Sequence, residues 1–415
     1  MHERMKLANG IVVAAEEIPT VRSVSVGLWL RTGSANERQQ NNGVSHFIEH
    51  MLFKGTEKYT AREIAEAMDA IGGQLNAFTS REYTCYYARV LDEHLEFAIS
   101  LLGEMLRFSR FDSGELEKER GVVLEEINMY QDEADELVHD QFVKSIFGDH
   151  PLGRPILGTM ESVASLTRED MIQYLSHFYT PQRLLVAAAG NVKQEQLTRI
   201  SREHLGDYLA EEMSDKCQPL AYRSQVRTGF KQTEQVHLVI GAPGISRLDP
   251  DRYALEVLEV ILGSGMSSRL FQELREDRGL VYSTYSFHSL YREHGLWGAY
   301  AGTGKGQAQA VIDAIVKQFT RIAEKPVTEA ELARAKQQLK GSLLIGLEST
   351  SNRMSRIAKN ELFLHEATSP QEEIALIEAV TEEEIQKLAQ RLLAEGLTMS
   401  AIGPIKEGDL VLPSL

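Results

Sequence analysis

The chain has 415 residues and a formal net charge of −16, with 43% hydrophobic and 25% charged residues. This composition is typical of a folded globular protein rather than a fibrous or disordered one, and the length predicts two to three domains. The acidic balance argues against a nucleic-acid partner, because phosphate recognition requires a basic surface.

Strands and helices are predicted in alternation along the chain. In the first half we expect strands at Gly10–Ala15, Val24–Leu30, Gln74–Phe78, Tyr83–Val90 and Arg183–Gly190, and helices at Val44–Phe53, Leu91–Arg107, Ser113–Tyr130 and Thr167–Phe178. A polar, Pro-containing stretch at 211–223 interrupts this pattern. Beyond it we expect a strand at Val236–Gly244, a helix from Arg252 and a β region at Val281–Tyr300.

Two pairs of segments indicate an internal duplication. Residues Phe111–Arg120 resemble Val327–Lys336 at an offset of 216, and Ser165–Ile172 resemble Ala379–Gln386 at an offset of 214. The alternative is that two α+β domains merely share helix-start signals. We therefore predict an α+β protein with homologous domains at 1–215 and 216–415.

The number of cysteines and the apolar segments indicate the cellular compartment of the protein and the kind of metal site it can form. Cys85 and Cys217 are the only cysteines, too few for a disulfide framework or a thiolate metal site. Residues 1–11 lack the apolar segment of a signal peptide, and no stretch approaches the roughly 18 apolar residues of a membrane span. We expect a cytoplasmic protein without a membrane span, in which any transition metal is held by histidine and carboxylate.

The segment His46-Phe-Ile-Glu49-His50 has the pattern of a zinc site. On a helix these three polar side chains share one face. Two imidazoles there can bind one Zn²⁺ at about 2.0–2.1 Å, and the carboxylate between them can then hold water. The alternative is a pair of ordinary histidines beside an acidic residue.

A catalytic zinc needs a third protein ligand and an open position. The predicted helix Ser113–Tyr130 supplies candidate carboxylates, among which Glu119 and Glu126 are seven residues apart and so lie on one face. One could ligate the metal while the other orients it, but spacing does not choose between Glu125 and Glu126. At the offset of 216 the second half has Ala335 and Ser342, and it has no His-x-x-Glu-His segment. One half therefore carries the predicted chemistry.

The chain resembles the pitrilysin/insulysin family of inverted zincins, in which the order is His-x-x-Glu-His. The likeness covers nearly the whole chain and is closest to the short-chain branch of mitochondrial processing peptidase β-subunits and bacterial relatives. The matching blocks are Gly43–Thr56, Asn76–Glu82, Glu119–Glu126 and Leu274–Tyr282.

The resemblance implies a role for each matching residue. His46, His50 and Glu126 would bind one Zn²⁺ per chain. Glu49 would be the general base, and Glu119 would orient the metal ligands. Four further residues would contact the substrate: Asn76 and Ala77 on an edge strand that pairs with the peptide, and Arg275 and Tyr282 in the second half.

The resemblance also implies a fold and partners. Two similar α+β domains would form half of a clamshell, and two chains would pair as a homodimer or as a heterodimer with a related inactive chain. The expected activity is zinc-dependent endopeptidase cleavage of unfolded peptides or presequence-like segments. The alternative is a non-catalytic scaffold of the same fold.

Overall fold

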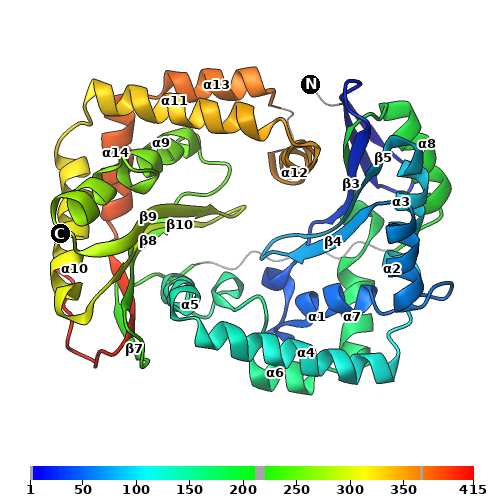
Figure 1. The fold of residues 1–415 in the computed structure, drawn as a ribbon, viewed down its shortest axis with the longest axis horizontal. Coiled ribbons are helices and arrows are strands. Elements are labelled where there is room, and N and C mark those ends of the chain that lie inside the picture. Colours follow the sequence, from blue (N-terminus) through cyan, green and yellow to red (C-terminus); the bar gives the residue numbers. More distant parts are fainter. Residues whose placement is uncertain (1–2, 211–219, 365–367) are drawn as a thin grey trace. The chain divides into compact units, whose positions relative to one another are not determined.

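The computed structural model describes residues 3–210, 220–364 and 368–415, drawn in Figure 1. These residues form two compact units. Among the described residues, the first comprises 3–128, 154–210, 346–364 and 368, and the second comprises 129–153, 220–345 and 369–415. The predicted boundary at 215/216 lies outside the described residues. No helix in the described ranges is long and apolar enough to cross a membrane.

The first unit is built on a six-stranded sheet. Its strands, in spatial order, are β1 (Glu3–Lys6), β2 (Val12–Glu17), β6 (Leu184–Gly190), β3 (Ser23–Leu30), β5 (Thr84–Leu91) and β4 (Gln74–Thr79). β2 and β6 are parallel, and the other neighbours are antiparallel. The helices of this unit are α1 (Val44–Leu52), α2 (Ala61–Ala70), α3 (Leu95–Phe108), α4 (Ser113–Asp132), α6 (Met160–Ser165), α7 (Arg168–Phe178), α8 (Gln194–Leu205) and α12 (Thr350–Lys359).

The second unit is built on a five-stranded sheet. Its strands, in spatial order, are β7 (Val226–Phe230), β11 (Thr398–Gly403), β8 (Val236–Gly244), β10 (Gly295–Thr303) and β9 (Val281–Leu290). Its helices are α5 (Ala134–Phe147), α9 (Arg252–Gly263), α10 (Ala308–Glu324), α11 (Glu329–Gly346), α13 (Pro370–Ala379) and α14 (Glu382–Leu393), with a π-helix at Phe271–Asp277.

The two sheets share one topology, which confirms the α+β class and the internal duplication. In each sheet one pair of neighbouring strands is parallel, β2 with β6 and β7 with β11. Each parallel pair is then extended by three antiparallel strands. The helices α4 and α11 begin at 113 and 329, and α7 and α14 begin at 168 and 382, which reproduces the offsets of 216 and 214 seen in the sequence.

Each unit also contains a helix from the other half of the sequence. α5 packs on β8 and β11, and α12 packs on β2, β3 and β6. The strand β6 is buried over its whole length because both faces are covered. Ala188 belongs to the core on one face, whereas Ala187 and Ala189 lie against Met354 and Ile357 of α12 on the other. The two units are therefore not two contiguous halves of the chain.

One predicted helix starts later than expected, and the predicted β region at Val281–Tyr300 is confirmed and contains two strands. The helix expected at Leu91–Arg107 begins at Leu95, because Leu91 pairs with Ser23 as the last residue of β5. The β region at Val281–Tyr300 consists of β9 and β10, which form an antiparallel hairpin. In both cases strand pairing, a long-range interaction, sets the boundary.

Candidate metal centre

On α1 the helical period places apolar residues on one face and polar residues on the other. Val44, Phe47 and Ile48 are buried in the core of the first unit, because residues three and four apart lie on one face. The opposite face presents the three polar side chains of the His-x-x-Glu-His segment. The predicted spacing therefore places them together on one side of a helix.

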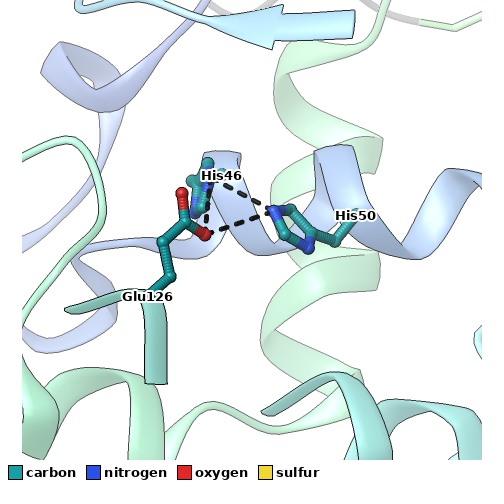
Figure 2. Close-up of side chains that lie close together, drawn as sticks. All are labelled: His46, His50 and Glu126. Atoms are coloured by element: carbon teal, nitrogen blue, oxygen red, sulfur yellow. Dashed lines mark hydrogen bonds and ion pairs between the residues drawn. The ribbon is translucent and has the colours of Figure 1, made fainter. Parts of the chain in front are cut away.

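His46, His50 and Glu126 point toward one another from α1 and α4 (Figure 2). The two Nε2 atoms are 3.3 Å apart. Glu126 Oε2 lies 3.8 Å from Nε2 of His46 and 3.7 Å from Nε2 of His50. Donors about 2.0–2.1 Å from a tetrahedral ion are roughly 3.3 Å apart, so these three atoms fit zinc with little adjustment. Glu125, the alternative left open by spacing, is exposed and lies outside this group.

A buried carboxylate orients His50. Glu119 is 5% exposed, and its Oε1 lies 3.1 Å from Nδ1 of His50. Its other oxygen forms an ion pair of 2.6 Å with Lys54. An N–H at Nδ1 that donates to Glu119 leaves the lone pair of Nε2 free for a metal. Lys54 was not predicted as a site residue, although it stands four residues after His50.

His46 is held differently. Its Nδ1 is buried without a hydrogen-bond partner among the described residues. Burial, and secondarily the nearby His50, lower the pKa of His46 to about 3. The imidazole is therefore neutral at physiological pH, and the neutral form is the one that binds metal.

Glu49 lies on the same face of α1 and accepts a hydrogen bond of 2.6 Å from Thr79 Oγ1 at the end of β4. Burial raises its pKa above the usual value of a glutamate, which makes the carboxylate a stronger base. The hydrogen bond occupies Oε2 and leaves Oε1 for a water molecule. Thr79 lies three residues after Asn76, but no local pattern relates it to Glu49.

The predicted substrate strand is the outermost strand of its sheet. β4 pairs with β5, and its other edge pairs with no strand in the described part of the chain. Asn76 and Ala77 lie in the middle of β4, and Asn76 is exposed. A free strand edge is the structural requirement for adding an extended peptide.

Arg275 and Tyr282 belong to the second unit. The Arg275 guanidinium lies 5.1 Å from the centre of the Tyr282 ring, and Tyr282 is 76% exposed. Arg275 lies on the π-helix Phe271–Asp277, a rare conformation that occurs often at functional sites. The two side chains thus form one contiguous polar and aromatic surface.

One other group of ligand-type side chains occurs in the described ranges, formed by Glu96, Glu203 and His204 on α3 and α8. Arg199 forms ion pairs with both carboxylates, at 3.6 Å and 2.9 Å. A cation therefore already neutralises this exposed group. The described part of the second unit contains no such group.

An inverted His-x-x-Glu-His helix, a glutamate on a following helix and a duplicated α+β fold define an inverted-zincin protein. Residues 12–160 match the insulinase family (peptidase family M16), and residues 165–339 match the peptidase M16 inactive domain. The chain belongs to peptidase family M16.

Two bacterial relatives extend this finding. The chain is 44% identical over 404 residues to "Uncharacterized zinc protease YmxG" of Bacillus subtilis, covering 97% of this chain and 98% of the relative. It is 42% identical over 412 residues to "Uncharacterized zinc protease SCO5738" of Streptomyces coelicolor, covering 97% and 90%.

A solved structure shares the fold. The crystal structure of a protease from Helicobacter pylori has a TM-score of 0.91 at 22% identity and covers 97% of this chain and 100% of that one. The chain is thus a member of a peptidase family whose named relatives are zinc proteases.

Proposed function

We propose that the chain is a zinc-dependent endopeptidase that cleaves unfolded peptides or presequence-like segments. The observation that carries this proposal is the triangle of donor atoms from His46, His50 and Glu126, with separations of 3.3–3.8 Å. One Zn²⁺ per chain would be held by these three residues. When bound, zinc polarises a peptide carbonyl and lowers the pKa of a water molecule to about 7.

The side chains around this position perform the proton transfers and the orientation. Glu49 removes a proton from the attacking water and returns it to the leaving amine, a step that requires a carboxylate within about 2.6–3.2 Å of that water. Thr79 fixes the rotamer of Glu49 through its hydrogen bond. Glu119 fixes the tautomer of His50 and forms an ion pair with Lys54 through its other oxygen.

Substrate binding is assigned to two surfaces. The main chain at Asn76 and Ala77 would pair with an extended peptide along the free edge of β4, which selects unfolded segments because a folded substrate cannot supply a strand. Arg275 and Tyr282 would bind the substrate and stabilise the negative charge that develops on the scissile carbonyl oxygen. We further propose a homodimer, or a heterodimer with a related inactive chain, as the assembled form.

The test is Glu49→Gln, which preserves the shape of the side chain but removes the base. We expect zinc content to remain as in the wild type and hydrolysis of a peptide library, read by mass spectrometry, to fall to the level of a chelator-treated sample. Glu125→Gln, an exposed change on α4, is the control and should cleave normally. Near-normal cleavage by Glu49→Gln would disprove the assignment of the base.

A non-catalytic scaffold of the same fold is the second candidate. It is disfavoured because all three donor residues are retained, together with Glu49 and Glu119. Native purification without stoichiometric zinc would favour the scaffold instead.

A further inference from the structure

A buried carboxylate lies at the N-terminal end of α1. Glu37 is 4% exposed. Its Oε2 accepts hydrogen bonds of 2.8 Å from the backbone N–H of Gly43 and from the side-chain amide of Asn42. Its Oε1 accepts a hydrogen bond of 2.8 Å from the backbone N–H of Ser45. Both oxygens are therefore engaged by N–H groups from the start of one helix.

This carboxylate replaces the local cap that α1 lacks. The N-cap residue is Gly43, which has φ of 94° and no side chain to accept the free N–H groups. Glu37 satisfies two of those groups from six and eight residues earlier in the chain. Burial raises the pKa of Glu37 to about 7, against the opposing effect of its hydrogen bonds from Asn42, Ser45 and Gly43. In its ionised form the carboxylate also complements the positive end of the helix dipole, which offsets part of the cost of burial.

The backbone before His46 is held from other sides as well. A Cβ on Gly43 would lie 2.7 Å from the carbonyl oxygen of Leu157, so the chain passes too close for any other residue. Ser45 Oγ donates a hydrogen bond of 2.9 Å to the hydroxyl of Tyr174. Protein contacts alone therefore fix the position of the first turn of α1.

The two histidines differ in what orients them. Nδ1 of His50 contacts Glu119, whereas Nδ1 of His46 has no hydrogen-bond partner among the described residues. Metal-binding histidines are usually held through their second nitrogen. The orientation of the His46 side chain must then be set by the position of its backbone. Glu37 anchors that backbone at Ser45, the preceding residue.

We propose that Glu37 is a positioning residue of the metal centre, whose carboxylate fixes the first turn of α1 and so directs His46 toward His50 and Glu126. Glu37 orients His46 through the backbone, whereas Glu119 orients His50 through a contact with the imidazole ring. The proposal rests on the proposed function in one respect, namely that the centre binds zinc.

The test compares Glu37→Gln with Glu104→Gln in the full-length protein. In Glu37→Gln an NH₂ group replaces one carboxylate oxygen and cannot accept a hydrogen bond from the N–H groups that face it. Glu104 is a matched control, because it is also buried (6% exposed) and pairs with Lys58 at 2.9 Å. The measurements are zinc affinity, by competition with a chromophoric chelator, and the absorption spectrum of the Co²⁺-substituted protein.

We expect Glu37→Gln to weaken zinc binding at least about tenfold, as loss of a ligand-orienting group does elsewhere, and to alter the Co²⁺ spectrum. Glu104→Gln should match the wild type in both measurements, and Glu37→Asp, which keeps the charge, should recover part of the affinity. Wild-type affinity and an unchanged spectrum in Glu37→Gln would overturn the proposal.

A second variant serves if Glu37→Gln does not fold. Asn42→Ala removes one of the three donors to the carboxylate and should weaken zinc binding a few-fold; unchanged affinity would again overturn the proposal. A wild-type protein that binds zinc but cleaves no peptide would refute the peptidase and leave this assignment standing. A wild-type protein that binds no zinc would refute both.

Discussion

The exchange of helices between the two halves predicts that the N-terminal half will not fold stably alone. A fragment of residues 1–217 lacks α12. It therefore exposes the face of its sheet that carries Trp29, Ala187 and Ala189, all fully buried in the intact chain.

The size of the effect follows from the side chains that α12 and the residues after it bury on this face. The four large ones are Met354, Ile357, Leu362 and Phe363, each at most 8% exposed. Burial of one such side chain contributes about 1.5–3 kcal/mol, so the four together contribute about 6–12 kcal/mol, an upper estimate. That is comparable to the whole stability of a typical domain, about 5–15 kcal/mol.

The assay is urea unfolding followed by circular dichroism, with binding of a hydrophobic dye to report exposed apolar surface. Residues 1–217 should bind dye and unfold without a cooperative transition. The same fragment joined by a flexible linker to residues 346–368 should recover cooperative unfolding. Replacing Met354 and Ile357 by Ser in the joined segment should abolish the recovery. Equal unfolding midpoints for the fragment with and without the added segment would refute the reasoning.

Three further predictions concern the metal centre and one ion pair. Zinc-binding free energies of about 10–16 kcal/mol shared among four ligands amount to about 3 kcal/mol for each. Glu126→Gln should therefore weaken zinc binding about a hundredfold, whereas Glu125→Gln should leave it unchanged in the same chelator competition. Lys54→Met removes the cation that pairs with Glu119 beside His50. This change should weaken zinc binding about tenfold, whereas Lys54→Arg should leave zinc binding unchanged. In the second unit, the hydrogen bond from Arg269 lowers the pKa of Glu331 to about 2. A depressed carboxyl pKa stabilises the fold above the unfolded value near 4.5, and this contribution is lost as the pH falls toward 2. Thr328 also donates hydrogen bonds to Glu331, and solvent screens the ion pair. Arg269→Met should therefore lower the free energy of unfolding by only about 1 kcal/mol at neutral pH. This difference from the wild type should shrink as the pH falls and be lost below about 2; a difference that does not shrink would contradict the assignment.

The local part of the metal centre was accessible from the sequence. His46, Glu49 and His50 lie within five residues on one helix, and their shared face follows from the helical period alone. For the third ligand, spacing alone did not choose between Glu125 and Glu126, because the two residues are adjacent. Their environments in the folded chain differ, with Glu126 beside the histidines and Glu125 exposed.

Two of the three groups that support the centre, Glu37 and Thr79, were not accessible from the sequence. Glu37, Thr79 and Glu119 contact α1 from 8, 30 and 69 residues away, counted respectively to Ser45, Glu49 and His50 in this chain. Nothing in the local pattern of Glu37 or Thr79 marks them, since their partners are set by how the chain packs. Glu119 was identified through its spacing from Glu126 and a family resemblance, not from a contact.

The α+β class, the duplication and the helix that carries the histidines follow from the order of the residues, because hydrophobic periodicity and internal repetition are properties of the chain read in order. The packing of α5 and α12 on sheets formed by the opposite halves of the chain became visible in the folded protein. Both are amphipathic helices, and an apolar face specifies that it must be buried but not against which sheet. That choice depends on chain connectivity and on the fit of side chains, here Met354 and Ile357 against the small residues of β6, and it makes each half of the duplicated chain depend on the other.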